Sequence, residues 1–178
     1  MTQLIITAVG PDRPGIVGEI TSYLHKCGAN ILDTRMVNLR GQFSLIILVE
    51  VSADQGAKLA ADLPAQAVEL GLQLSVIPQS ETPPRVEGLA YRLKTYSSDQ
   101  PGIVARLTGL LRSFGINIEE LAAWQESAAF AGNPIFLCEI KMTVPAAVSI
   151  STLRADVTRL CNELNCDADL EPLAGERI

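Results

Sequence analysis

Two short segments of the sequence combine an acid, a proline and a glycine in a way that suits binding of a small anion. Asp12-Arg13-Pro14-Gly15 follows a β-branched run, and Asp99-Gln100-Pro101-Gly102 returns 87 residues later. A helix that begins at such a proline has amide groups without acceptors, at the positive end of its dipole. Both features favour a carboxylate or a similar anion. We therefore expect each segment to form a strand-to-helix turn that can bind a ligand.

Each residue type in these segments has its own expected role. The aspartate is placed to cap the helix by accepting a hydrogen bond from the glycine amide. The proline fixes φ for the first helical turn, and the glycine lets a ligand approach the backbone because it has no Cβ. An apolar residue of the helix follows. The predicted ligand-binding residues of the two segments are Asp12, Pro14, Gly15 and Ile16, and Asp99, Pro101, Gly102 and Ile103.

An asparagine follows each predicted helix, two residues after the glycine that ends it. These residues are Asn30 after Gly28 and Asn117 after Gly115. An amide side chain can accept a hydrogen bond from an ammonium group and donate one to a carboxylate. We add Asn30 and Asn117 to the predicted site, whose combined chemistry suits a free α-amino acid. The same residue types are also common in ordinary turns, so a purely structural role stays open.

These segments belong to a longer internal repeat with an offset of 87 residues. Between residues 12 and 31, ten of twenty positions are identical to their counterparts in the second half. Such self-similarity indicates two copies of one structural unit. Pro78 to Gly88 contains three prolines and alternating charges, which cannot continue a strand or helix. We predict a first module over 1–79, a linker over 80–87, a second module over 88–172 and a tail over 173–178.

The elements that must position these residues follow from hydrophobic periodicity. In the first half we predict strands over 3–9, 29–39, 43–51 and 73–77, and helices from residue 14 to Gly28 and over 54–70, with Pro64 breaking or kinking the second. The second half repeats this βαββαβ order. The order implies an α+β, ferredoxin-like fold, a four-stranded antiparallel sheet with both helices on one face. Each module is close to the smallest size that folds alone, so we expect the two to pack together.

Composition and charge exclude several classes of function. The chain has 14 Lys and Arg against 20 Asp and Glu, a net charge of −6, and no basic run, so we expect no direct contact with nucleic acid. No stretch reaches the roughly 20 apolar residues of a membrane span, and the N-terminus reaches a turn too early for a secretory signal, so we expect a cytoplasmic protein. Single cysteines and one histidine, His25, give no metal site. No nucleophile-base pair or phosphate loop is visible, so we expect no catalysis and no cofactor.

The βαββαβ order, with DRPGIV and DQPGIV opening the first helix of each copy and GANI and GINI starting the next strand, resembles the ACT domain. The resemblance covers nearly the whole chain. It implies a ligand site at the strand-to-helix loop, commonly at an interface between two ACT modules. It also implies a repressor that senses an amino acid, glycine or a similar one, and controls transcription by binding a DNA-binding activator protein rather than DNA. The alternative is a regulatory subunit of an amino-acid or one-carbon metabolic enzyme, and a homodimer is a further possibility.

Overall fold

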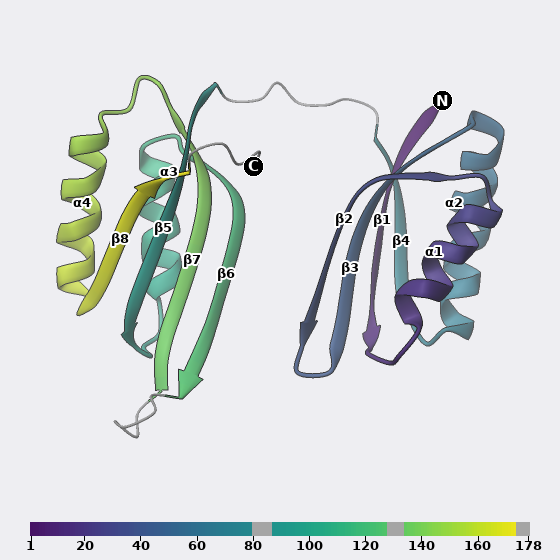
Figure 1. The fold of residues 1–178 in the computed structure, drawn as a ribbon, viewed down its shortest axis with the longest axis horizontal. Helices are drawn as coiled ribbons and strands as arrows, with labels where there is room; N and C mark the ends of the chain where they lie inside the picture. The colour runs from purple at the N-terminus through teal and green to yellow at the C-terminus, as the bar shows by residue number, and fades with distance from the viewer. Residues whose placement is uncertain (80–86, 128–133, 174–178) are drawn as a thin grey trace. The chain divides into compact units, whose positions relative to one another are not determined.

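The apolar runs of the first half form strands and helices in the predicted order. The computed structural model describes residues 1–79, 87–127 and 134–173, and the chain divides into two units, Met1–Pro83 and Pro84–Ile178 (Figure 1). The elements of the first unit are β1 (Thr2–Pro11), α1 (Ile16–Lys26), β2 (Asn30–Leu39), β3 (Gln42–Val51), α2 (Ala53–Glu69) and β4 (Gln73–Gln79). Apart from Glu87 and Leu173, the predicted linker and tail lie outside the described residues.

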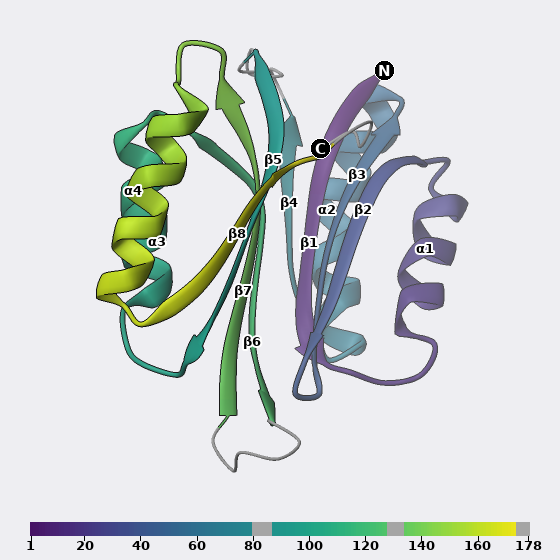
Figure 2. The same cartoon turned by 60° about the vertical axis from the view of Figure 1, so that its left-hand side comes forward.

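The second unit repeats this order. Its elements are β5 (Gly88–Ser98), α3 (Ile103–Ser113), β6 (Asn117–Ser127), β7 (Pro134–Pro145), α4 (Ile150–Glu163) and β8 (Cys166–Pro172). Each unit has one antiparallel sheet of four strands, in the orders β2-β3-β1-β4 and β6-β7-β5-β8. In each unit both helices cover the same face of the sheet (Figures 1 and 2). The predicted ferredoxin-like fold is therefore confirmed for both copies.

Strand alternation builds the core of each unit. In β1 every second residue, Leu4, Ile6 and Ala8, is buried under the helices. The helix α1 contributes Ile16, Ile20 and Leu24 to the same layer, at the spacing of one helical face. Each buried Leu or Ile of this layer contributes about 1.5–3 kcal/mol. This packing fixes α1 across the sheet, and with it the loop that joins β1 to α1.

The expected break at Pro64 does not occur. The helix α2 is continuous from Ala53 to Glu69 and contains Pro64 within it. Leu59 and Leu63 before the proline, and Ala67 after it, are all buried on the same face. Tertiary packing on both sides of the proline therefore outweighs the one helical hydrogen bond that it removes.

Candidate functional site

Both helices that follow the acid-proline-glycine segments begin two residues later than predicted. The first helical residues are Ile16 and Ile103 rather than Pro14 and Pro101. Gly15 and Gly102 precede them with φ of 90° and 95°, in the left-handed region. A right-handed helix cannot include a residue with that φ, so the prolines belong to the turn. Glycine reaches the conformation without the steric cost that a Cβ would add.

The predicted capping by the two aspartates is wrong. No side chain caps α1 or α3. Instead, Asp12 Oδ2 accepts a hydrogen bond of 2.5 Å from Asn38 Nδ2, and Asp99 Oδ2 accepts one of 2.7 Å from Gln125 Nε2. The left-handed glycine turns the chain, and the aspartate bonds with the neighbouring strand. Sequence reasoning missed Asn38 and Gln125, although both lie 26 residues after their aspartate, at matching repeat positions.

Because no side chain caps α1, its first amide groups keep hydrogen-bonding capacity. Ile16 N donates to Arg13 O at 3.4 Å, and Glu19 N donates to Gly15 O at 2.9 Å. The amides of Val17 and Gly18 lie between them, in the first helical turn, where a helix offers no acceptor. Together with the helix dipole, these amides make the start of α1 suitable for a carboxylate.

A groove of about 510 Å³ lies beside this loop, between α1 and the C-terminal part of α2. Gly15 and Gly18 line it at the start of α1. The other lining residues are Glu19, Ser22, Tyr23 and Lys26 from α1 and Leu63, Gln66, Glu69 and Leu70 from the α2 side. The groove therefore has hydroxyl, carboxylate and ammonium groups over an apolar base.

Two of the residues that line the groove, Glu19 and Tyr23, have shifted pKa values. Arg13 donates to both carboxylate oxygens of Glu19 at 2.6 Å, and this bond holds the pKa of Glu19 below its usual range. Burial raises the pKa of Tyr23, and the nearby Cys27 adds to the rise. Glu19 is therefore an anion and Tyr23 a neutral hydroxyl at neutral pH.

In the second module the equivalent loop makes different hydrogen bonds and ion pairs. Gln100, at the position of Arg13, donates to the carbonyl oxygen of Leu164 just after α4. Arg106, at the position of Glu19, forms an ion pair with Glu163 of α4. These bonds join the loop and α3 to α4 on the side where the first module has its groove. The two copies of the motif therefore have different surroundings despite the shared sequence.

Within one module, the structure does not bring the asparagines to the glycine loops. Asn30 pairs with Glu50, which lies opposite Gln3 near the start of β1, whereas Pro11 at the other end pairs with Gln42. Figure 1 shows the β1–α1 loop beside the β2–β3 hairpin, with the start of β2 at the far end of the sheet. Asn117 occupies the same place in β6, and its amide donates to Glu119 at 2.8 Å. The side chain of Asn30 makes no hydrogen bond with the described residues.

Other kinds of site find little support in the described ranges. Among the residues placed by the structure, no group of three or more His, Cys, Asp or Glu side chains could hold a metal ion. Over the same residues, no helix has both the length and the apolar character needed to cross a bilayer.

Comparison with known proteins gives consistent matches. A family model described as ACT domain matches residues 2–77. UPF0237 protein MK1213 of Methanopyrus kandleri is 41% identical over 78 residues, which are 43% of this chain and 87% of that protein. The glycine cleavage system transcriptional repressor of Escherichia coli (strain K12) is 29% identical over 167 residues, 94% of this chain and 88% of that protein. A crystal structure of an unknown protein from Galdieria sulphuraria has a TM-score of 0.83 and 29% identity, and covers 97% of this chain and 99% of that one.

Proposed function

The chain belongs to the ACT-domain family, and we propose that it is a non-catalytic regulator that senses glycine or a similar amino acid and represses transcription through a protein partner. The observation that carries the proposal is the 29% identity to a glycine cleavage system transcriptional repressor along 94% of this chain. The match extends over both modules, so it concerns the whole arrangement and not one domain. The identity supports a regulatory role, to which we add an amino-acid ligand and a protein partner.

The geometry of the first module supports an amino acid as the ligand. The uncapped start of α1 offers the amides of Val17 and Gly18 to a carboxylate. Asp12, four residues before Ile16, is exposed and offers a carboxylate to an ammonium group. The groove beside Gly15 gives the ligand access to the loop. In the second module the bonds of Gln100 and Arg106 occupy the corresponding side. We therefore assign sensing to the first module and a structural role to the second loop.

A second copy of the chain would complete this site. β2 is the end strand of its sheet, and all ten of its residues are exposed. An unpaired edge of this length favours pairing with another strand. Antiparallel pairing of two β2 strands around a two-fold axis would place Asn30 of one copy near the Leu39 end of its partner, where Asn38 contacts Asp12. The loop and the asparagine, separated within one module, would then share one ligand.

The charge of the chain supports a protein partner over DNA. The net charge is −6, and a protein of this sign is repelled by phosphates. Regulation of transcription would therefore act through contact with a DNA-binding activator.

Ligand-induced stabilisation tests the sensing step. A ligand present at 100 times its dissociation constant raises the free energy of unfolding by about 2.7 kcal/mol. We expect glycine to raise the melting temperature of the purified protein, and Asp12→Ala to abolish the rise. Asp99→Ala is the matched control and should leave the rise intact. No rise with glycine, serine or any other amino acid would contradict the sensor.

Capture from a native extract tests the second step. The protein, immobilised with and without glycine, should retain a DNA-binding activator in a glycine-dependent manner, identified by mass spectrometry. Retention of a catalytic subunit of amino-acid or one-carbon metabolism would instead support the alternative of an enzyme's regulatory subunit. A gel shift with the protein alone that weakens with salt would contradict both and indicate direct DNA binding.

A further inference from the structure

The face of the first sheet opposite α1 and α2, which we call the open face, is rich in aliphatic side chains. One face of an antiparallel sheet commonly contacts water and is then polar. Here Ile46 is 45% exposed and Ile77 is 52% exposed. Strand alternation and register place the following apolar residues on this face: Ile5, Val9, Val37, Leu39, Ile46, Leu48 and Ile77. Exposed apolar patches of this kind mark binding surfaces.

The corresponding rows of the second module contain ion pairs. In the first module one row across the sheet is Ile77, Ile5, Leu48 and Asp33. In the second module the same row is Glu171, Arg92, Lys141 and Glu120. Arg92 pairs with Glu171 at 2.5 Å and Lys141 with Glu120 at 3.1 Å. In the next row Lys94 pairs with Glu139 at 3.3 Å, where the first module has Thr7 and Ile46. In these two rows the first module has aliphatic side chains at positions where the second module has ion pairs.

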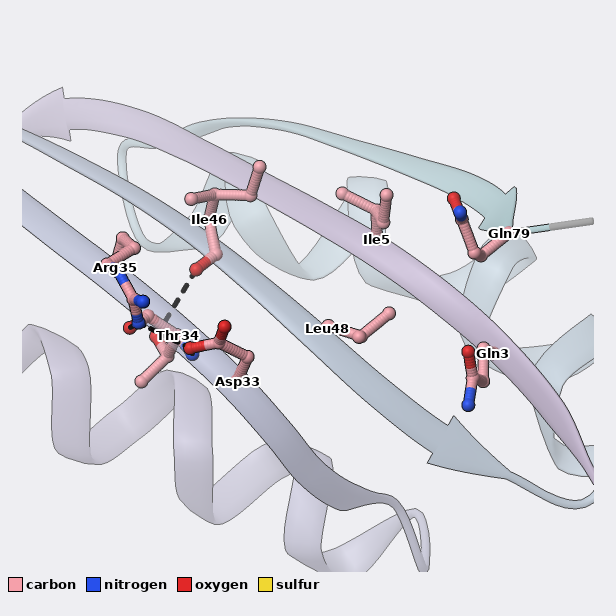
Figure 3. A pocket seen from close by; sticks show the side chains of 8 residues that line it. All are labelled: Gln3, Ile5, Asp33, Thr34, Arg35, Ile46, Leu48 and Gln79. Carbon is pink, nitrogen blue, oxygen red and sulfur yellow. Dashed lines mark hydrogen bonds and ion pairs between the residues drawn. The ribbon is translucent and has the colours of Figure 1, made fainter. Parts of the chain in front are cut away.

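A hollow of about 310 Å³ lies on the open face of the first module (Figure 3). Its base is formed by Ile5, Ile46 and Leu48 from the two central strands. One end has charged and polar groups of β2, and the other has two amide side chains, as Figure 3 shows. The end residues are Asp33, Thr34 and Arg35, and Gln3 and Gln79. An apolar base with a few polar groups at its ends is the composition of a small-molecule site.

The charges at the β2 end point to a zwitterion. Asp33 Oδ1 accepts from the Arg35 guanidinium and from Thr34 N, and both charged side chains are more than half exposed. A protein partner covering them would have to desolvate both charges, which costs free energy unless each gains a new partner. An amino acid brings a carboxylate for Arg35 and an ammonium for Asp33. The ligand therefore removes water only from the side of each charged group that it contacts.

We propose that this hollow is a second ligand site, for an α-amino acid with a branched aliphatic side chain. The α-carboxylate and α-ammonium contact Arg35 and Asp33, and the side chain packs on Ile5, Ile46 and Leu48. The site is separate from the groove beside Gly15, whose lining does not include Ile5, Ile46 or Leu48. Glycine has no side chain to bury here, so the two sites have different ligands. The inference does not depend on the function proposed above.

Titration of the full chain with leucine, isoleucine and valine tests the proposal, with methyl-labelled NMR spectra as the readout. We expect saturable shifts of the Ile5, Ile46 and Leu48 methyl groups, and none of them with glycine. Ile46→Glu introduces the residue that the second module has at this position, and because Ile46 is 45% exposed the change leaves the buried core untouched. We expect it to weaken leucine binding by about tenfold or more, as loss of an apolar contact of ~1.4 kcal/mol would do.

Val9→Glu is the matched control. Val9 is on the same face and has the same exposed fraction as Ile46, 45%, but does not line the hollow. The Val9→Glu variant should bind leucine with an affinity within about twofold of the wild-type value, a change of less than half a kcal/mol. Equal weakening by the two variants would contradict a specific pocket. So would methyl shifts that follow protein concentration rather than leucine, because a second copy would then occupy the face. Glycine stabilisation of Ile46→Glu, measured in parallel, separates failure of this site from failure of the sensor.

Discussion

Asn38 donates a hydrogen bond to Asp12 across 2.5 Å, and it does so from the strand end that adjoins the candidate loop. Asp12 N also donates to Gly41 O at 2.8 Å, so two bonds join the loop to the β2–β3 hairpin. The carboxylate bonds with Asn38 and does not cap α1. The same arrangement in the second module, with Gln125 and Asp99, makes this bond a feature of the repeated unit. The turn is open at the helix because its acid is bonded elsewhere.

Removal of the Asn38 side-chain amide should destabilise the β1–α1 loop. We expect Asn38→Ala to lower the free energy of unfolding by about 1 kcal/mol, the usual net value of a hydrogen bond near the surface. It should also weaken glycine binding, because Asp12 loses its orientation. Thermal denaturation and calorimetric titration measure the two effects. Gln125→Ala should lower stability less, because Asn38 also accepts a hydrogen bond from Gly41 N at 3.0 Å, and it should not affect glycine binding. An equal loss of binding in both variants would contradict the assignment to the first module.

The repeat made the order of elements predictable, because each helix and strand was visible twice. Local pattern was less informative where a residue's partner is distant in sequence. Asp12 followed by Pro14 suggests a cap on local grounds, and only the register of β2 against β3 brings Asn38 beside it. An amide 26 residues after the aspartate in both copies was the available signal.

The expected meeting of Asn30 with Gly15 failed for a related reason. Both are close to α1 in sequence, but a helix of eleven residues separates its two ends by about 16 Å, at 1.5 Å per residue. The start and the end of α1 therefore lie at opposite ends of the sheet. Sequence reasoning treated chain proximity as spatial proximity.

The left-handed glycine of the loop should not tolerate a side chain. We expect Gly15→Ala to lower the free energy of unfolding by about 1–2 kcal/mol, the cost of a left-handed residue with a Cβ. Gly18→Ala should instead raise it by about 0.5–1 kcal/mol, since Gly18 is helical and a Cβ there meets no atom within 4 Å. Urea denaturation of the two variants measures both. A stabilised Gly15→Ala would mean that the turn is not left-handed in solution.

One pair of neighbouring core residues differs in size between the two modules, so that a larger residue at one position meets a smaller one at the other. A Cβ on Gly10 would lie 2.7 Å from Leu72 Cδ2 and 2.8 Å from Gly71 O. At the equivalent positions the second module has Ser97 opposite Cys166, a smaller partner. We expect Gly10→Ser to cost about 1–3 kcal/mol by overpacking, and Leu72→Cys added to it to cost less than the sum of the single changes. A double-mutant cycle by thermal unfolding measures the coupling, and simple additivity would contradict it.

The thiols of the second core should be inert until the protein unfolds. Burial raises the pKa of Cys161 to about 11, and burial also raises the pKa of Cys138. A thiol that stays protonated in the folded state but ionises in the unfolded state favours unfolding at high pH. We therefore expect stability to fall as pH rises from about 9 toward 11, and less so in Cys161→Ala. At neutral pH a thiol reagent should label only the partly exposed Cys27 quickly, and fast labelling of Cys138 would contradict this burial.

Mixing of variants tests whether two copies share one glycine site. Asp12→Ala removes the loop half of the proposed site, and Asn30→Ala removes the strand half, so neither variant should bind glycine alone. In a heterodimer of the two, one site has both defects and the other has neither. When equal amounts are unfolded and refolded together, half of the dimers should be mixed, and binding should return at about a quarter of the wild-type number of sites. Calorimetric stoichiometry measures this fraction. If no binding returns while an affinity tag on one variant co-purifies the other, then Asp12 and Asn30 act within one chain or Asn30 has no part in the site.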